Sequence, residues 1–407
     1  MNLSSGQTLK IAKRLKDKTD LEDVSGQERE KRPETILFFS FVSHKPKHTI
    51  AMKKTFALMA LAVMFIPAWS QNVSRSEAKA LQAFLSAPAA KEATNAAALN
   101  FTGNNVAHCP GVKVEGGHVV SIEWKNKDLA GSLNLTSFPS LTKVDISGNK
   151  ITGLTLAQLP VLDAVNASRN RISQITITEV PALQSLKLNR NRIADIELGV
   201  MPALKRLNIA SNLLASLDVE NAAALEILNC TSNHLESISV ANCTQLKSLY
   251  AAFNELRELQ LSGLLKLENL NIGDNKVSKL YIQNLPSLTT LFCSDNHMTN
   301  LVVNDCPALN DVYAPYNDLT AFTVTNCPNL GFVNLAWNDI TYLNLSNQNF
   351  LQRVNVSNNQ LVTLDVSFDN MLTYLNIANN YNLTDLRTVN DTQLRQVVGV
   401  WDEWGGI

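Results

Sequence analysis

The chain is poor in charged and aromatic residues, and its cysteines follow no metal-binding or scaffold spacing. Of 407 residues, 17% are charged, 6% are aromatic and 45% are apolar. The six cysteines contain no CxxC pair and are too sparse to staple a chain of this length. A formal net charge of −1 gives no overall attraction for nucleic acid or an anionic membrane. The apolar content excludes a disordered or fibrous chain and indicates a buried core.

The common catalytic motifs are also missing. The chain contains no HExxH, GxSxG, P-loop or GxGxxG pattern, each of which would place catalytic or phosphate-binding groups at a fixed spacing. The repeats and caps described below occupy nearly all of residues 71–407, which leaves no segment for a separate catalytic domain. We therefore predict that the protein is not an enzyme and uses no cofactor and no metal.

The apolar run at residues 56–66 is too short to span a bilayer comfortably. It follows two lysines after Met52 and precedes a small-x-small cleavage site at residues 68–70. This order predicts a secretory signal peptide at 52–70, with 1–51 a spurious or disordered upstream extension, and export to the periplasm, the cell surface or the medium. The alternative is a cytosolic protein with a disordered leader and a buried apolar segment. Without residues 1–70 the net charge is −6, which argues further against nucleic acid.

Asparagine recurs every 21 residues through most of the remaining chain. We call the twelve residues of this series the ladder asparagines: Asn149, Asn170, Asn191, Asn212, Asn233, Asn254, Asn275, Asn296, Asn317, Asn338, Asn359 and Asn380. From Asn149 to Asn359, apolar residues stand 8, 5 and 3 positions before each one and 2, 5 and 7 positions after it, and all 66 of these positions are apolar. Such a period predicts a solenoid, in which adjacent coils bury a continuous core.

The spacing within a repeat predicts one short strand per coil. In the repeat of Asn191, Leu186 and Leu188 alternate with Lys187, so the leucines face inward and the lysine outward. The asparagine amide both donates and accepts hydrogen bonds, so a stacked column can satisfy backbone groups where each coil leaves its strand. The second half of each coil should return as an extended or 3-10 segment, because proline recurs there at 160, 181, 202, 286, 307 and 328.

The pattern LxxLxLxxNxIxxLxL resembles the leucine-rich repeat family, and its 21-residue period is similar to that of bacterial surface proteins of the internalin type. The resemblance covers residues 119–386. It implies an α/β repeat solenoid, a leucine-rich repeat horseshoe or arc with a parallel β-sheet on the concave face and extended or 3-10 segments on the convex face. It also implies a protein-binding role of the adhesin or recognition type.

The flanking segments are predicted to cap this solenoid. Residues 71–118 form an N-terminal helical cap, because the segment 74–99 has helical spacing with Leu81, Phe84 and Leu85 on one face. Residues 119–390 form the solenoid, whose first coil has Lys127 in place of a ladder asparagine. Residues 391–407 form a C-terminal cap with a last strand within 394–401.

Two copies of one cysteine and histidine spacing invite a metal or redox interpretation: Cys230, His234 and Cys243, then Cys293, His297 and Cys306. The copies lie 63 residues apart, a multiple of the repeat, and Cys230 and Cys293 occupy a position where other coils mostly have Leu or Ile. We predict buried thiols that act as small apolar residues, and histidines in exposed turns. Cys306 and Cys327 are equivalent in adjacent coils and within disulfide reach, and both the bridged and the free state stay open.

The variable information lies on the outer strand positions, 6, 4 and 2 before each ladder asparagine, and on the residues flanking it. In early coils these positions form a basic zone of Lys143, Arg169, Arg171, Lys187, Arg190, Arg192 and Arg206. In later coils they form an aromatic zone of Tyr250, Phe253, Phe292, Tyr313, Tyr316, Phe332, Trp337 and Tyr374, beside Asp274, Asp295, Asp311, Asp318 and Asp339. Gathered exposed aromatics indicate a binding site, and the alternative is cross-strand packing. The acids are either solvated charges or calcium ligands, and the basic zone is either a solvated face or a site for an acidic partner.

We therefore predict a secreted, non-enzymatic protein that binds a macromolecular partner, first of all a protein, on its concave face. The candidate partner-binding residues are the eight of the aromatic zone together with Arg169, Arg190 and Arg192. A glycan-binding module is the alternative, since Tyr and Trp beside Asp and Asn also suit sugar rings. A structural or assembly protein of the cell envelope is the third option. Neither nucleic-acid binding nor a membrane span after signal cleavage is expected.

Overall fold

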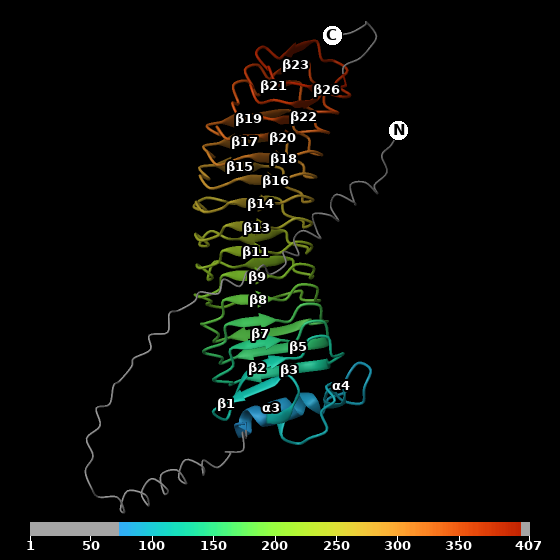
Figure 1. The fold of residues 1–407 in the computed structure, drawn as a ribbon, viewed down its shortest axis with the longest axis vertical. Coiled ribbons are helices and arrows are strands. Elements are labelled where there is room, and N and C mark those ends of the chain that lie inside the picture. Colours follow the sequence, from blue (N-terminus) through green and yellow to red (C-terminus); the bar gives the residue numbers. More distant parts are fainter. Residues whose placement is uncertain (1–72, 400–407) are drawn as a thin grey trace, which may run out of the picture. The chain divides into compact units, whose positions relative to one another are not determined.

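The structure is a computed structural model, and it describes residues 73–399. The predicted extension at 1–51 and the predicted signal peptide at 52–70 lie outside the described residues, as does the C-terminal segment from residue 400. From residue 73 to 399 the chain forms a stack of coils with one strand of each coil on a shared face (Figure 1). None of the helices in this part is long and apolar enough to cross a membrane.

One face of the stack is a 15-stranded main sheet. In spatial order its strands are β1 (Val112–Glu115), β2 (His118–Glu123), β4 (Lys143–Asp145), β6 (Ala164–Asn166), β8 (Ser185–Lys187), β9 (Arg206–Asn208), β11 (Ile227–Asn229), β13 (Ser248–Tyr250), β14 (Asn269–Asn271), β16 (Thr290–Phe292), β18 (Asp311–Tyr313), β20 (Phe332–Asn334), β22 (Arg353–Asn355), β24 (Tyr374–Asn376) and β26 (Gln396–Val398). β1 and β2 are antiparallel, and the later pairs are parallel. Between β4 and β24 the paired residues are 21 apart, so equivalent residues of successive coils lie side by side.

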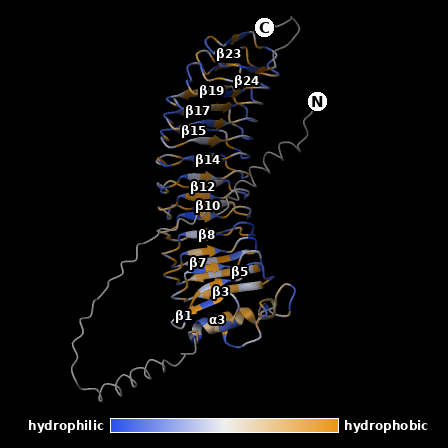
Figure 2. Cartoon of the chain, in the orientation of Figure 1, coloured by the Kyte–Doolittle hydropathy of each residue, from blue (hydrophilic) through white to orange (hydrophobic). Residues whose placement is uncertain are grey.

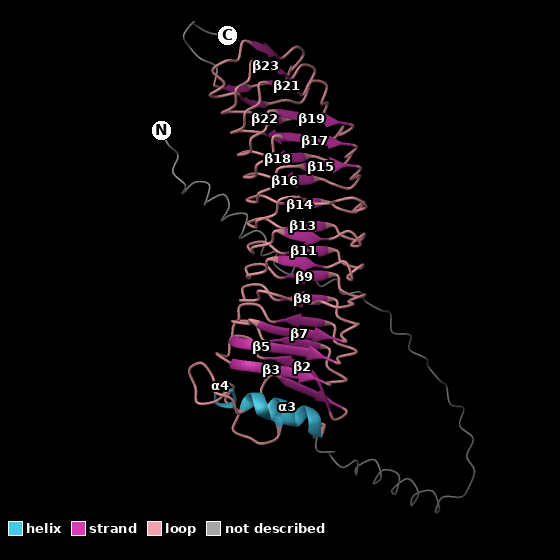
Figure 3. Ribbon diagram, turned by 180° about the vertical axis from the view of Figure 1, so that it is seen from behind, coloured by secondary structure: helices cyan, strands magenta, loops and turns pink. Residues whose placement is uncertain are grey.

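The opposite, return face carries shorter sheets of parallel strands (Figure 3). They are β3 (Ala130–Thr136), β5 (Lys150–Ala157) and β7 (Gln174–Thr178); β10 (Ser216–Asp218) and β12 (Ser237–Ser239); β15 (Leu280–Gln283), β17 (Asn300–Asn304) and β19 (Ala321–Thr325); and β21 (Tyr342–Asn344), β23 (Thr363–Asp365) and β25 (Asp385–Arg387). The expected return segments are therefore extended. Within residues 73–399 the 3-10 geometry is confined to η1 (Val106–His108), which precedes the first coil.

Helix is confined to the N-terminal end of the described chain (Figure 3). The helical spacing over 74–99 gives two helices, α3 (Arg75–Leu85) and α4 (Asn95–Ala98), because the intervening segment contains Pro88 and Thr94 caps the second helix. Leu81, Phe84 and Leu85 of α3 are buried, as the periodicity predicted. The ring of Phe84 stacks on that of Trp124 in the first coil, with centroids 5.6 Å apart. The helix thus covers the first apolar layer of the solenoid.

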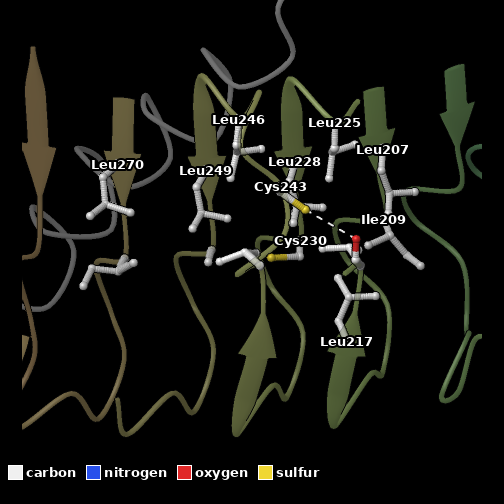
Figure 4. Close-up of a cluster of buried hydrophobic side chains, with 14 of the residues drawn as sticks. Leu207, Ile209, Leu217, Leu225, Leu228, Cys230, Cys243, Leu246, Leu249 and Leu270 are labelled. Atoms are coloured by element: carbon white, nitrogen blue, oxygen red, sulfur yellow. Dashed lines mark hydrogen bonds between the residues drawn. The ribbon is translucent and has the colours of Figure 1, made fainter. Parts of the chain in front are cut away.

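A continuous apolar core fills the interior from Val73 to Ile377. Leucines of neighbouring main-sheet strands point into it together with Leu217 of return strand β10, as Figure 4 shows for one stretch. Figure 2 shows the apolar residues recurring on successive strands of the stack. Because each inward leucine contacts its equivalents in the coils above and below, the apolar periodicity in the sequence translates directly into this column.

The ladder asparagines join each coil to the one before it. In the coil of Asn275, the side-chain Nδ2 donates to the carbonyl oxygens of Ala251 (3.0 Å) and Ile272 (2.9 Å), and Oδ1 accepts from the Leu256 amide (3.0 Å). Asn275 is 6% exposed. The predicted hydrogen-bonding role is confirmed, and the bonds run from each amide to the backbone of its own coil and of the preceding coil. A buried turn is satisfied in this way in every coil with a ladder asparagine.

Candidate binding face

The outward positions of the main sheet are where the alternation predicted them. In β18 the outer residues Asp311 and Tyr313 are half-buried, while Val312 between them is fully buried. Parallel pairing then places the outer residues of neighbouring coils in columns that run across the strands, about 4.8 Å apart. The outward positions of the main sheet therefore form regular columns, and packing of the core does not restrict which side chain occupies each of them.

Three rings of the aromatic zone form one stack across β16, β18 and β20. The centroids of Phe292 and Tyr313 are 4.4 Å apart at 16°, and those of Tyr313 and Phe332 are 4.7 Å apart at 32°. All three rings are half-buried by one another. Burial, followed by the charge of Asp311, raises the pKa of the Tyr313 hydroxyl. These rings thus do stabilise the sheet as cross-strand pairs, which was the alternative interpretation, and they keep one surface exposed.

A second ring pair stands at the edge of the sheet. Tyr316 and Trp337 stack with centroids 5.6 Å apart at 14°, and they are 42% and 47% exposed. Their amides donate to the carbonyls of Ala336 (3.0 Å) and Ser357 (2.9 Å) in the next coil, which fixes the backbone from which the rings project. Of the eight aromatic residues predicted to be exposed, these two are more than a third exposed, and the other six are half-buried. The expectation of eight exposed rings was wrong for these six, three of which lie against one another on neighbouring strands.

The residue before each ladder asparagine has a left-handed backbone. The series is Asn126 in the first coil, then Gly148, Arg169, Arg190, Ser211, Ser232, Phe253, Asp274, Asp295, Tyr316, Trp337, Asn358 and Asn379, with φ between 52° and 70°. We call this the edge row. Gly, Asn, Asp and to a lesser degree Ser suit this conformation, whereas a bulky side chain is destabilised in it by about 1–2 kcal/mol. The bulky exceptions, two arginines and three aromatics, are all candidate binding residues, and backbone strain retained at such positions is typical of functional sites.

Half-buried carboxylates accompany the rings. Asp274 and Asp295 are neighbours in the edge row, and burial, followed by the charge of Asp295, raises the pKa of Asp274 to about 6. Burial also raises the pKa values of Asp295 and Asp311. Among the described residues, no lysine or arginine forms an ion pair with these three carboxylates, whereas Asp318 lies 3.7 Å from the Nδ1 atom of His297.

The remaining aromatic residues lie apart from the two stacks. Tyr250 in β13 is separated from Phe292 by strand β14, where Asn271 occupies the intervening position. Tyr374 is separated from Phe332 by Arg353, whose guanidinium carbon lies 5.2 Å from the Tyr374 ring centroid. Arg353 thus belongs to the face although it was not predicted. The sequence could have identified Arg353, because it stands six residues before Asn359, in the outward column that also contains Phe332.

The basic zone is not brought together with the aromatic zone. Strands β9 and β11 lie between the coil of Arg190 and that of Tyr250. Arg169 and Arg190 are in the edge row, and Arg171 and Arg192 are exposed beyond the ladder asparagines. Part of the positive charge is compensated locally, since Lys143 pairs with Glu123 at 3.0 Å.

The cysteines and histidines form no metal site in the described chain. Cys230 and Cys293 are fully buried, and burial raises their thiol pKa values, to about 12 for Cys230. His234 and His297 are exposed, in agreement with the prediction. No group of three potential ligands that could hold a metal ion occurs among residues 73–399. Cys306 and Cys327 are buried and both are free thiols.

Two shallow hollows lie on the return side of the stack. One, of about 510 Å³, is lined by Ser137, Pro139, Gln158, Pro160, Glu179 and Pro181, and the other, of about 460 Å³, by Leu265, Asn284, Pro286, Asp305, Pro307 and Asn326. They follow the recurring prolines, beside which Ser137, Gln158 and Glu179 line one hollow and Asn284, Asp305 and Asn326 line the other. The exposed pair of rings is on the main-sheet face, where we place the candidate site.

Comparison with known proteins agrees with this fold. No protein-family model and no curated protein matches the chain. Among solved structures, YopM, a leucine-rich effector protein from Yersinia pestis, is 23% identical over 69% of this chain and 77% of that chain, with a TM-score of 0.53. The internalin inlF from Listeria monocytogenes is 17% identical over 77% of this chain and 94% of that chain, with a TM-score of 0.47, and the functional domain of InlJ from the same organism is 21% identical over 70% and 72%, with a TM-score of 0.40. The likeness to YopM shows that the chain has the leucine-rich repeat fold, as the sequence resemblance implied.

Proposed function

We propose that this leucine-rich repeat chain is a recognition protein that binds a protein partner on the main-sheet face between β13 and β24, and that it performs no catalysis. The observation that carries the proposal is the placement of Phe253, Tyr316 and Trp337 in the left-handed edge row, where a smaller residue would be more stable. The exposed Tyr316 and Trp337 pair provides large anchors, and aromatic anchors dominate binding hot spots.

Glycan binding is the second candidate. The same two rings stand beside carboxylates and amides, and a sugar ring stacks on an aromatic face while its hydroxyls bond such groups. An assembly role in the cell envelope is the third. No observation on the main-sheet face favours this assembly role.

Capture by the immobilised full chain, followed by identification of the retained material, tests the proposal. A protein partner should be retained by the unmodified chain and lost from the double variant Tyr316→Asn, Trp337→Asn. The matched control is Tyr281→Ala with Tyr342→Ala, which removes two exposed rings from the return face. Retention that resists protease and is abolished by glycosidase would favour the glycan alternative, and equal retention by both double variants would contradict the proposal.

We further propose that the protein is exported after cleavage near Gln71, on the evidence of the segment that begins at Met52. N-terminal sequencing of the protein from its own cells tests this step. A soluble cytoplasmic product that retains residues 1–51 would contradict both the cleavage and the export.

A further inference from the structure

The later edge row places two carboxylates beside two exposed rings. Asp274, Asp295, Tyr316 and Trp337 occupy the same position in four successive coils. The Asn275 amide donates to the Asp295 carbonyl (3.1 Å) and the Asn296 amide to the Tyr316 carbonyl (3.2 Å), so the backbones of these residues lie directly against one another. Consecutive members of the row are about 4.8 Å apart. The side chains therefore form one short strip, acidic at one end and aromatic at the other.

The two carboxylates lack the cations that neighbouring acids have. In nearby coils Glu226 pairs with Lys247 at 3.0 Å and Glu255 pairs with Lys276 at 2.7 Å, and each pairing lowers the pKa of the glutamate. Asp274 and Asp295 are half-buried and have no such partner among the described residues, and burial raises the pKa of both carboxyls, with the charge of Asp295 adding to the shift of Asp274. A half-buried negative charge without a partner is costly, and a cation supplied from outside would relieve that cost.

The adjoining rings have the geometry that attracts the same ligand. Trp and Tyr faces attract cations through their quadrupoles, and Trp does so most strongly. Burial, followed by the charge of the nearby Asp295, raises the pKa of the Tyr316 hydroxyl. A lysine or arginine side chain offers a charged end for the carboxylates and an apolar stem for the rings, so such a side chain suits the junction between Asp295 and Tyr316, where the acidic and aromatic ends meet.

Other occupants fit the strip less well. A metal ion needs more than two ligands, and no third candidate ligand completes a metal-binding group in the described chain. A neutral sugar would stack on the rings and leave the two charges uncompensated. We propose that Asp274, Asp295, Tyr316 and Trp337 form the subsite that receives a lysine or arginine side chain of a cationic polypeptide partner. The inference rests on the proposed function, because it names the chemistry of the partner at that same face.

The probe is a synthetic peptide of alternating lysine and serine, blocked at both ends, with counterparts that carry glutamate or norleucine in place of lysine. Binding of each labelled peptide to the full chain is measured by fluorescence anisotropy at pH 7 and low ionic strength. The lysine peptide should bind at least about tenfold more tightly than the other two. The norleucine peptide separates charge from the contribution of the apolar stem.

Two double variants test the residues. Asp274→Asn with Asp295→Asn removes the charge and keeps a residue suited to the left-handed backbone, and it should weaken the lysine peptide about tenfold or more. Asp163→Asn with Asp195→Asn makes the same change in net charge at exposed positions of the early coils and should have little effect. Tyr316→Asn with Trp337→Asn installs the residue that Asn358 and Asn379 already provide in this row, so it should fold normally while weakening the peptide to a similar extent.

The outcomes separate the inference from the proposed function. Equal binding of the lysine peptide by the two aspartate double variants would mean that only the overall negative charge matters, and would overturn the inference. If the unmodified chain bound calcium and the Asp274→Asn, Asp295→Asn variant did not, the inference would be overturned in favour of a metal site. Failure of the lysine peptide to bind, while a captured protein is still lost from the Tyr316 and Trp337 variant, would overturn the cationic subsite and leave the proposed function intact.

Discussion

The side-chain amide of Asn95 pairs with both backbone groups of Ala130, as a neighbouring strand would. Its Oδ1 accepts from the Ala130 amide at 3.0 Å, and its Nδ2 donates to the Ala130 carbonyl at 2.9 Å and to the Phe84 carbonyl at 2.9 Å. Asn95 is fully buried. Ala130 begins β3, the first strand of the return face, so one side chain of the short helix α4 occupies the hydrogen-bonding edge of that sheet.

Asn95→Ala should therefore destabilise the N-terminal end of the solenoid. The substitution leaves the buried Phe84 carbonyl and the half-buried backbone groups of Ala130 unpaired, and a buried group left unpaired costs about 1–3 kcal/mol. The expected result is a lower urea midpoint, with circular dichroism reporting the transition. Asn104→Ala, at an exposed position of the same cap, is the control and should leave the midpoint nearly unchanged.

Asn275→Ala tests the ladder in mid-solenoid. It removes bonds to the backbone of its own coil and of the preceding coil, and should lower the free energy of unfolding by about 1–3 kcal/mol or more. Asn300, exposed on the return face, provides the comparison. If Asn275→Ala and Asn300→Ala gave the same urea midpoint, the ladder would not be a source of stability.

The burial of Asp369 predicts that the stability of the fold decreases as the pH rises from about 4 to about 8. It is fully buried, its Oδ1 accepts from the Gln348 amide (2.7 Å), and its Oδ2 has no hydrogen-bond partner. Burial raises the pKa of Asp369 to about 8, and the nearby charges of Asp391 and Asp365 act in the same direction. Because the folded-state pKa lies above the unfolded value of about 3.9, this contribution to stability is complete below about pH 4 and is lost as the pH rises through about 8.

The variant Asp369→Asn removes that titration and keeps an acceptor for the Gln348 amide. Urea midpoints between pH 5 and pH 9 should fall with rising pH in the unmodified chain and fall less in the variant, which becomes the more stable of the two at pH 9. Parallel pH profiles for the two proteins would show that Asp369 does not titrate as its burial implies.

Protonation of Asp274 should weaken cation binding at mildly acidic pH. Its carboxyl has a pKa of about 6, so it is ionised at pH 7.5 and protonated at pH 5. If the carboxylate contacts the cation, affinity for the lysine peptide should decrease as the pH falls through about 6. In Asp274→Asn the affinity should be low and nearly constant over this interval. A pH profile of the same shape in both proteins would place the titrating group elsewhere.

The sequence by itself determined the solenoid. Short-range alternation decides which residues of each coil face inward, and a repeat of constant length forces equivalent residues into columns, so Leu186, Lys187 and Asn191 could be placed correctly without knowledge of any long-range contact. The same alternation and constant repeat length also predicted which aromatic and basic residues face outward.

The tertiary structure alone decided how far those outward residues are exposed and what they contact. Stacking between coils buries much of Phe292, Tyr313 and Phe332, and it leaves Tyr316 and Trp337 open because they stand at the edge of the sheet. The left-handed backbone of the edge row could not be predicted from the sequence, because Gly148 is the only glycine among its residues. The pairing of Asn95 with Ala130 joins segments 35 residues apart outside the repeat, where no periodicity relates one position to another. Periodicity fixes which residues are neighbours, whereas exposure, ionisation and backbone strain depend on the size and charge of the neighbours actually present.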